Sequence, residues 1–360
     1  MPLFESLYKA LTDRINQGNY RKLKSSDGFL DFFSNDYLGL SQKNIFLNSP
    51  QSKGSSRLIA GTTNNHLIAE KEFAKHFRAD CSLFFNSGYS ANIGFFSSIP
   101  TRDSIVLFDE YIHASVKDGM RLSLGKSVRF RHNDIQDLER LLKKFSDKNL
   151  LIVIESLYSM HGDIAPLREI IDLARKYDAF LFIDEAHAGG VFGEFGEGLT
   201  SNELLQGINY VKLITFGKAF GSHGAVILSN QLIKDFLVNF ARSFIYTTAL
   251  PDYIVQQSLA NVKSDNLKEL QVKLQKNIQT FRSLVKNKEY LKSSEISPIQ
   301  IIQLESLEKL KQVEEQLIKE KIGVKAIYAP TVPKGEERLR ISIHANHKKE
   351  DLMRLGVGGF

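Results

Sequence analysis

The sequence predicts an α/β protein with a mainly parallel β-sheet in a large domain and a smaller α+β unit after it. Between residues 82 and 228, short apolar runs alternate with segments whose apolar residues recur at helical spacing. Strands that are apolar throughout are typical of a parallel sheet covered on both faces. After Pro251 the alternation stops, and a long charged helical stretch leads into short strands. These two observations place the change of architecture near residue 250.

The elements of the first two thirds are expected as follows. An amphipathic helix over residues 1–18, without the apolar core of a secretory signal, precedes a short strand at 29–33, a turn at 35–40 and a loop at 50–62. Asn133 or Asp134 caps one later helix, and Pro166 stands in the first turn of another. We expect strands at 82–85, 105–108, 128–131, 150–154, 180–184, 211–214 and 225–228, and helices at 66–77, from 88 onward, at 114–124, 133–145 and 166–177.

The C-terminal third reads as a smaller unit of mixed helices and strands. We expect a long helix at 252–288, strands at 299–304, 324–328 and 339–343, and a helix at 307–321. The predicted organisation is an N-terminal helix and arm over 1–40, a large domain over 41–250, and a linking helix with a small domain over 251–360.

Composition narrows the class of protein. The 360 residues are 42% hydrophobic and 24% charged, which is ordinary for a globular chain of this length. The single cysteine, Cys81, excludes an intramolecular disulfide and favours the reducing cytoplasm. No apolar run reaches membrane-spanning length, and no aromatic-basic motif points to nucleic acid. The net charge of +6 is mild, and a basic surface can attract a polyanion such as a coenzyme A thioester.

One lysine is well placed for chemistry. Lys218 lies among small residues just after the apolar strand at 211–214. An amine becomes a nucleophile when its surroundings lower its pKa, as in lysines that form Schiff bases. Glycines at 217, 221 and 224 let the backbone approach a ligand closely. Alone, the segment also fits a surface turn, so its interpretation depends on a second segment earlier in the chain.

That second segment places a carboxylate and an imidazole together. Asp184 falls at the carboxyl end of the strand at 180–184, where ligands of open α/β sheets bind. A carboxylate there can pair with the cationic ring nitrogen of pyridoxal phosphate, and His187 can reach the same ligand from the turn. Taken singly, Asp184 would be a cap and His187 a loop histidine. Their order before Lys218 favours a cofactor site.

Other strands also end in polar groups. Residues 86–92 join a strand to a helix; alone they fit an ordinary glycine turn, but the free N–H groups of the helix could also bind the cofactor phosphate. His113 follows the next strand and can stack on a pyridine ring, although a lone histidine there is more often structural. Glu155 and Ser159 follow another strand. If the strands are parallel, these groups open onto one crevice.

Two further candidate segments lie later in the chain. Thr247 and Thr248 read by themselves as ordinary strand threonines. Arg338 and Arg340 alternate with apolar residues and so share one face of a strand. This face is either a solvated edge or, through Arg340, a bidentate clamp for a substrate carboxylate. No cluster of residues predicts a metal site.

In this order, the residues resemble the α-oxoamine synthase family of pyridoxal phosphate enzymes. The resemblance runs from Asn35 to His347. Its most specific part is Thr-Phe-Gly-Lys-Ala-Phe-Gly-Ser-His-Gly at 215–224, supported by Asp-Glu-Ala-His-Ala-Gly-Gly-Val-Phe-Gly at 184–193 and Ala-Pro-Thr-Val-Pro at 329–333. The Ser-His pair after the lysine is similar to the member that condenses L-alanine with a pimeloyl thioester in biotin biosynthesis.

The resemblance implies a fold-type I transferase with a mainly parallel seven-stranded sheet, working in the cytoplasm as a homodimer with active sites at the subunit interface. It implies pyridoxal 5'-phosphate as cofactor and L-alanine with pimeloyl-CoA or pimeloyl-acyl-carrier protein as substrates. Lys218 then forms the Schiff base and serves as general base. Asp184 pairs with the pyridine nitrogen, His187 contacts the ring hydroxyl, and His113 stacks on the ring.

The remaining implied contacts surround the cofactor and the substrates. Gly88 and Tyr89 lie at the phosphate, and the implied homodimer supplies Thr247 and Thr248 across its interface. The resemblance places Thr215, Glu155, Ser159 and Asn35 at the cofactor or substrate. Arg340 holds the amino-acid carboxylate, and Thr331 lies in the segment that closes over the acyl substrate.

The chain departs from the family pattern in ways that leave the acyl chain open. Its N-terminal region is shorter, so Arg14 is the candidate contact for an acyl carboxylate, and Tyr328 stands where related enzymes often carry arginine. The alternatives are sister enzymes that use glycine with acetyl-CoA (glycine C-acetyltransferase) or serine with a long acyl thioester, and a pyridoxal phosphate aminotransferase. A non-catalytic protein of this fold is disfavoured, because Lys218 and Asp184 are both present.

Overall fold

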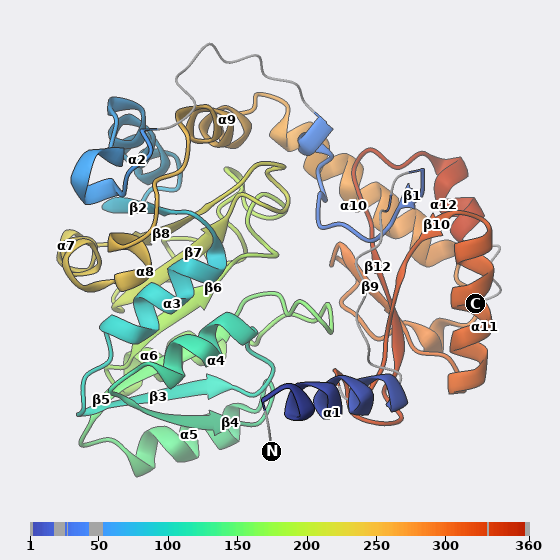
Figure 1. Cartoon of the computed structure of the whole chain (residues 1–360), viewed down its shortest axis with the longest axis horizontal. Coiled ribbons are helices and arrows are strands. Elements are labelled where there is room, and N and C mark those ends of the chain that lie inside the picture. Colours follow the sequence, from blue (N-terminus) through green and yellow to red (C-terminus); the bar gives the residue numbers. More distant parts are fainter. Residues whose placement is uncertain (1–2, 18–25, 27, 43–52, 330, 357–360) are drawn as a thin grey trace.

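A seven-stranded sheet forms the centre of the larger part of the molecule (Figure 1). The structure is a computed structural model and describes residues 3–17, 26, 28–42, 53–329 and 331–356. Strand β8 is antiparallel to both of its neighbours, and the other strands are parallel. In sheet order the strands are β2 (Cys81–Phe85), β8 (Ala225–Ser229), β7 (Tyr210–Thr215), β6 (Phe180–Asp184), β5 (Asn149–Glu155), β3 (Ser104–Asp109) and β4 (Lys126–Phe130).

Helices cover both faces of this sheet, as the apolar strands predict. Along β5, Leu151 and Val153 belong to one buried cluster, whereas Ile152 and Ile154 belong to another on the opposite face. This alternation is the pleat of a strand that is buried on both sides. The helices that supply the two clusters are α3 (Gly88–Ser98), α4 (Ala114–Arg121), α7 (Gln231–Phe240) and α8 (Arg242–Ile245) on the first face, and α5 (Ile135–Lys144) and α6 (Leu167–Lys176) on the second.

The C-terminal part is built on a smaller antiparallel sheet. Its order is β11 (Lys325–Ile327), β12 (Arg338–Ser342) and β9 (Ile299–Ile302). A two-stranded parallel pair, β1 (Leu30–Asp31) with β10 (Ile322–Gly323), ties the N-terminal arm to it. The remaining helices are α1 (Leu3–Asn16), α2 (Asn64–His76), α9 (Asp252–Val262), α10 (Leu267–Leu284), α11 (Leu307–Lys319) and α12 (Lys349–Gly356), with short turns at Leu40–Gln42, Arg57–Gly61 and Lys288–Tyr290.

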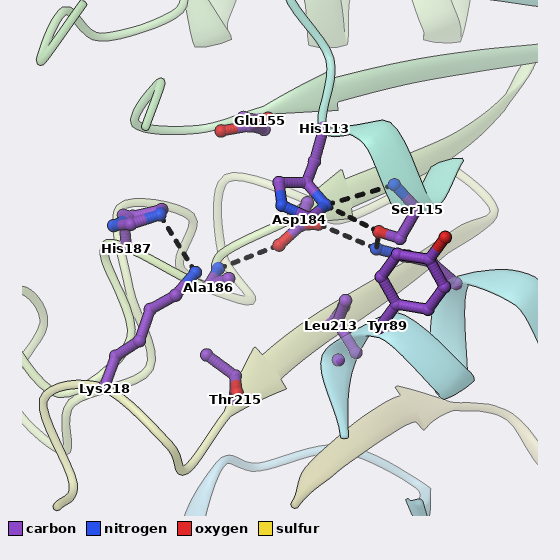
Figure 2. Close-up of a pocket in the computed structure, with 12 residues that line it drawn as sticks. Tyr89, His113, Ser115, Glu155, Asp184, Ala186, His187, Leu213, Thr215 and Lys218 are labelled. Carbon is purple, nitrogen blue, oxygen red and sulfur yellow. Dashed lines mark hydrogen bonds between the residues drawn. The ribbon is translucent and has the colours of Figure 1, made fainter. Parts of the chain in front are cut away.

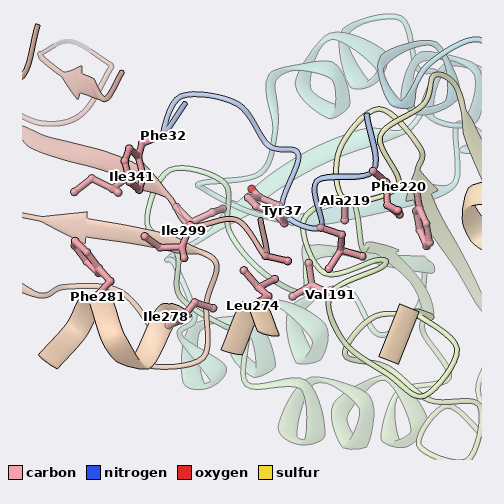
Figure 3. Close-up of a cluster of buried hydrophobic side chains, with 14 of the residues drawn as sticks. Phe32, Tyr37, Val191, Ala219, Phe220, Leu274, Ile278, Phe281, Ile299 and Ile341 are labelled. Carbon is pink, nitrogen blue, oxygen red and sulfur yellow. The ribbon is translucent and has the colours of Figure 1, made fainter. Parts of the chain in front are cut away.

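One buried cluster joins the two parts (Figure 3). The cluster contains Phe32 and Tyr37 of the N-terminal arm, Ile341 of β12 and Phe220 from the segment after Lys218, with Phe32 near Ile341 at one end and Phe220 at the other. Apolar side chains from the arm, the large sheet and the small sheet thus form one core that holds the two parts together. Among the described residues, no helix is long and apolar enough to cross a membrane.

Several elements differ from the prediction: α7, α8, α12 and β10 were not expected, and two expected segments fold differently. The expected helix at 252–288 is two helices, α9 and α10, and between them the backbone N–H of Leu267 bonds to the carbonyl of Ser264 at 3.0 Å in a turn. The expected loop at 50–62 contains a π-helical turn at Arg57–Gly61, where the buried guanidinium of Arg57 donates to Glu70 at 2.9 Å. That tertiary contact has no local sequence signal. The predicted fold class is confirmed, and the domain boundaries at residues 40 and 250 remain predictions.

Candidate active site

The carboxyl ends of β5, β6 and β7 open onto a cavity of about 160 Å³ (Figure 2). Several predicted residues from different segments meet there because parallel strands bring their carboxyl ends to one edge of the sheet. The predicted residues that line it are Gly88, Tyr89, His113, Glu155, Asp184, His187, Thr215 and Lys218. Sequence reasoning did not single out the four other lining residues, Asn92, Ser115, Ala186 and Leu213.

Asp184 is a buried carboxylate held by neutral donors. Its Oδ1 accepts from the backbone N–H of Ala186 at 3.0 Å, and its Oδ2 accepts from Asn92 Nδ2 at 3.2 Å. Asn92 lies one turn into α3 from Gly88 and also donates to Ser115 Oγ at 2.9 Å. Asp184 can therefore both cap the following turn and bind a ligand. Its carboxylate is 4% exposed and has only neutral hydrogen-bond donors, so its negative charge still favours a cationic partner.

Lys218 carries an amine that is poised to lose its proton. Its Nζ lies 2.9 Å from Nε2 of His187 (Figure 2). Burial lowers the pKa of Lys218 to about 8, although the negative charges of Asp184 and Glu155 oppose this. The neutral amine, which a nucleophile and general base requires, is then far more populated near pH 7 than in an ordinary lysine.

The loop that carries Lys218 depends on a glycine. Gly221 has φ +56°, and a Cβ there would lie 2.2 Å from the backbone nitrogen of Ser41. The backbone N–H of Gly221 also bonds to the carbonyl of Lys218 at 2.8 Å. Gly221 is therefore needed where the N-terminal arm passes the lysine loop, whereas its expected role in close approach to a ligand remains a prediction.

His113 combines the two roles that the sequence left open. It is the N-cap of α4, since its Nδ1 accepts from the N–H of Ser115 at 3.2 Å, and its ring also lines the cavity. Burial lowers the pKa of His113, although Asp184 opposes this. The cap fixes the ring orientation at the edge of the cavity, as a stacking residue requires.

Glu155 and the start of α3 leave polar groups at the cavity. Burial, reinforced by the charge of Asp184, raises the pKa of Glu155 to about 8, so this side chain is mostly protonated at pH 7. Its Oε2 accepts from the N–H of Ser159 at 3.0 Å, whereas its Oε1 has no partner in the part of the chain that the structure describes. At the start of α3, Ser87 Oγ caps the helix by accepting from the N–H of Ser90 at 3.1 Å. Gly88 faces Thr215, and a Cβ at this glycine would lie 3.8 Å from the threonine side chain.

A second cavity of about 570 Å³ shares His113, His187 and Lys218 with the first, so the two form one cleft. Arg340 is fixed at its wall, because its Nε donates to the carbonyl of Ser159 at 2.8 Å and its Nη2 to Asn35 Oδ1 at 2.9 Å. A guanidinium held in this way is pre-oriented for a carboxylate. The remaining lining residues are Asn35, Glu110, Tyr111, Ile112, Ala114, Lys117, Ser159, Met160, His161, Lys325, Ile327, Thr331, Val332, Pro333 and Arg340.

Three predicted contacts lie elsewhere in the described chain. Neither cavity lining includes Thr247, Thr248 or Arg14 among the residues described. The two threonines accept from Asn86 Nδ2, at 3.3 Å to Thr247 Oγ1 and 2.7 Å to the carbonyl of Thr248, just before the start of α3. Arg14 lies exposed in the last turn of α1. Their assigned contacts remain predictions.

Sequence reasoning missed a buried network beneath the site. Glu185 is fully buried and accepts from Ser156 and from the N–H of Thr200 at 2.9 Å, while Lys212 donates to the carbonyl of Thr200 at 2.6 Å. The carbonyl of Glu185 also accepts from the N–H of Gly189 at 2.7 Å. The network thus anchors the turn between Asp184 and His187. A lysine inside an apolar strand was the available signal.

A second buried cluster borders the larger cavity. His132 lies between Asp109, with 2.9 Å from Nδ1 to Oδ1, and Asp163, with 2.7 Å from Nε2 to Oδ2. Beside it, the ring of His161 stacks on Tyr111 at 4.2 Å between centroids. Burial opposes the imidazolium, but the hydrogen bonds to the two carboxylates outweigh this and raise the pKa of His132 to about 9.

This raised pKa predicts a loss of stability at alkaline pH. A group with a raised folded-state pKa stabilises fully below its unfolded value, near pH 6.5, and loses this contribution as the pH rises through about 9. We expect the free energy of unfolding to fall by on the order of 2 kcal/mol more between pH 6.5 and 9.5 in the natural protein than in His132→Gln. Urea unfolding at both pH values measures this, and equal pH dependence in the two proteins would contradict it.

The architecture and the cleft define the class of fold: a mainly parallel sheet with buried lysine, carboxylate and imidazole groups at its carboxyl edge is that of the fold-type I pyridoxal phosphate transferases. The chain belongs to the aminotransferase class I and II family, whose model matches residues 27–356.

Individual relatives narrow the comparison. The chain is 36% identical over 346 residues to a protein of Methanocaldococcus jannaschii named putative 8-amino-7-oxononanoate synthase, covering 93% of this chain and 92% of that protein. The solved 8-amino-7-oxononanoate synthase of Francisella tularensis is 30% identical, with TM-score 0.75, over 92% of this chain and 97% of that one. A serine palmitoyltransferase variant of S. paucimobilis with a bound PLP–myriocin aldimine is 26% identical, with TM-score 0.87, over 99% and 96%.

These findings confirm the resemblance to α-oxoamine synthases and the fold class that it implied. Of these three relatives, the two with the higher sequence identities are named 8-amino-7-oxononanoate synthase. The structural superposition is better with the serine palmitoyltransferase, at TM-score 0.87, than with the Francisella tularensis enzyme, at 0.75. The fold is therefore common to both branches, and the distinction between them depends on the substrates.

Proposed function

We propose that this protein is a pyridoxal phosphate-dependent acyltransferase, an 8-amino-7-oxononanoate synthase of biotin biosynthesis. It joins L-alanine to a pimeloyl thioester and releases coenzyme A and carbon dioxide. The observation that carries the proposal is one cleft that holds the buried Lys218 amine, the Asp184 carboxylate and the fixed Arg340 guanidinium. The names of the relatives at 36% and 30% identity support the choice of member.

The residues of the smaller cavity fit pyridoxal phosphate. Asp184 offers a buried carboxylate to a cationic ring nitrogen, and Glu155 Oε1 is a buried polar atom without a partner among the described residues. The N-terminus of α3 at Gly88 offers N–H groups to a phosphate, and Lys218 offers an amine to an aldehyde. When bound, the cofactor supplies an electron sink that stabilises negative charge at the substrate Cα.

The protein's own groups orient the substrate and move the proton. Arg340 binds the carboxylate of alanine from the wall of the larger cavity. Lys218, whose pKa is about 8, takes the Cα proton as general base and returns a proton to the product carbon. His113, fixed as the N-cap of α4, would limit motion of the bound cofactor ring. His187 positions the amine of Lys218, whose Nζ lies 2.9 Å from its Nε2. The apolar side chains of Met160, Ile327 and Val332 in that cavity accept the acyl chain.

The test is thiol release from pimeloyl-CoA by cofactor-loaded protein with L-alanine. Glycine with acetyl-CoA and L-serine with palmitoyl-CoA run in parallel, and reactions without amino acid are the controls. Release with alanine and pimeloyl-CoA, with 8-amino-7-oxononanoate found by mass spectrometry, supports the proposal. Thiol release only with glycine and acetyl-CoA, or only with L-serine and palmitoyl-CoA, would leave the family assignment unchanged but assign the protein to a sister activity. Pimeloyl-acyl-carrier protein is tested as the alternative thioester.

Two further parts of the proposal concern assembly and location. The proposed homodimer would place Thr247 and Thr248 across its interface, and light scattering of the purified protein measures the molar mass against that of one chain. The proposed location is the cytoplasm, consistent with a free, buried Cys81.

Amino transfer from alanine to a keto acid, without thiol release, would instead favour an aminotransferase.

A further inference from the structure

Tyr37 connects the amine of Lys218 to the guanidinium of Arg340 through a continuous line of hydrogen bonds. The Tyr37 hydroxyl lies 2.8 Å from Nδ1 of His187, whose Nε2 lies 2.9 Å from Lys218 Nζ. On its other side the hydroxyl donates to Asn35 Oδ1 at 3.0 Å. Arg340 Nη2 donates to the same oxygen at 2.9 Å. The two ends of the cleft are thus joined inside the protein.

The chemistry of the ends fixes the direction of each bond. A guanidinium only donates, so Asn35 Oδ1 accepts from Arg340 and also accepts the Tyr37 proton. Because the Tyr37 hydroxyl proton points to Asn35, the tyrosine oxygen accepts from Nδ1 of His187. The ring proton of His187 therefore lies on Nδ1. Nε2 is then an acceptor and receives an N–H of Lys218. Burial, with the charge of Lys218 adding to it, holds the pKa of His187 well below its usual range, so the ring is neutral.

Tyr37 is held firmly and remains protonated. Its side chain is fully buried, and burial raises the pKa of Tyr37 to about 12 although Arg340 opposes this. Its carbonyl accepts from the N–H of Ala345 at 2.6 Å, and its ring meets His344 edge-on at 6.4 Å between centroids. In the described chain neither cavity lining includes Tyr37, so it acts through other side chains.

We infer that Tyr37 is a positioning residue that fixes His187 in the Nδ1–H tautomer, so that Nε2 stays an acceptor toward Lys218. The inference rests on the proposed role of Lys218 as the reacting amine. The same hydroxyl orients Asn35 beside Arg340. One buried side chain of the N-terminal arm therefore sets the geometry of both the amine and the carboxylate clamp.

The first test reads the tautomer directly. Full-length protein stripped of cofactor is labelled with ¹⁵N only at histidine, and the ring nitrogens of His187 are assigned by comparison with His187→Gln. In the natural protein the proton is expected on Nδ1. At about pH 9.5, where Lys218 with its pKa of about 8 is mostly neutral and can accept a hydrogen bond, the ring proton of His187 in Tyr37→Phe should shift to Nε2, because Nδ1–H loses its acceptor. Unchanged His187 shifts in Tyr37→Phe would overturn the inference.

Matched variants separate this role from a general effect on folding. Tyr158→Phe is the control, because Tyr158 is as deeply buried as Tyr37, at 1% exposure, but its ring lies edge-on to His132 in the neighbouring cluster, so His187 should not change. Asn35→Ala is a second route that leaves the core tyrosine in place. It frees the Tyr37 proton to turn toward Nδ1, which should also move the ring proton to Nε2. Retention of Nδ1–H in Asn35→Ala counts against the inference even if Tyr37→Phe does not fold.

The second test measures the amine. Competitive acetylation of the stripped protein across pH 6–10, read at Lys218 by mass spectrometry, gives the neutral fraction of that amine. An Nε2–H ring cannot accept from Lys218, so the neutral fraction at pH 7 should rise about threefold to tenfold in Tyr37→Phe and stay constant in Tyr158→Phe. An equal fraction in all three proteins would overturn the inference. Neither readout uses a substrate, so failure of the condensation assay would be a separate result.

Discussion

Lys218→Ala is expected to abolish thiol release from pimeloyl-CoA, by at least about 10³-fold, while leaving the protein folded. The amine is the group that bonds to the cofactor aldehyde and moves the Cα proton in the proposed reaction. Its side chain lines the cavity, and the loop around it is held by backbone bonds such as that from the N–H of Ser222 to the carbonyl of Phe216 at 2.8 Å. Truncation should therefore not disturb the core.

The measurement combines the thiol assay with thermal unfolding and with the visible absorption of added pyridoxal phosphate. Lys143→Ala, on the exposed side of α5, is the matched control and should behave as the natural protein. Normal product formation by Lys218→Ala would refute the proposed mechanism. Loss of activity in both variants would point to a handling artefact and not to the cleft.

Asp184→Asn is expected to keep the fold and bind cofactor but to lower turnover about a hundredfold. Replacing the carboxylate removes the charge that stabilises a cationic ring nitrogen, a loss on the order of 3 kcal/mol for a buried pair. The structure accommodates the amide, because Asn92 Oδ1 has no partner among the described residues and Asn92 can rotate to accept from the new donor.

The checks are turnover, cofactor affinity by absorbance titration, and thermal unfolding. Asp172→Asn on α6 changes an exposed carboxylate whose pairing is with Arg175 at the surface, and it should leave turnover unchanged. Undiminished turnover in Asp184→Asn would show that Asp184 does not support the ring nitrogen. Loss of cofactor binding in place of slower turnover would give the carboxylate a binding role only.

The large sheet was predictable because its signal is local. Strands buried on both faces are nearly continuous apolar runs, and the seven strands expected between residues 82 and 228 correspond to β2 to β8, although the edge strand β4 is mostly exposed. The small domain was less predictable, since the expected strand at 324–328 is only Lys325–Ile327 and the long helix is interrupted before Leu267. Short elements there depend on packing against α10 and α11, which a window of sequence does not record.

The site divides in the same way. Lys218, Asp184, His187 and His113 were found because each follows a recognisable strand, and the parallel topology brings them to one cavity. Glu185 and Lys212 were missed, although a lysine inside an apolar strand was a signal, since both are held through Thr200, which is distant in sequence from each of them. Arg340 was predicted from the alternation of arginines and apolar residues along one strand. Its orientation, however, is set by the hydrogen bond from its Nε to the distant carbonyl of Ser159.

The sequence by itself determined the class of fold, the order of the strands along the chain and the identity of the groups at their carboxyl ends, because apolar periodicity and residue type are local properties. Tertiary structure alone decided which of these groups touch, how burial moves the pKa of Lys218 to about 8 and of Glu155 to about 8, and that Tyr37 reaches His187. Desolvation and hydrogen-bond direction depend on atoms brought together from distant segments, so they exist only in the folded chain.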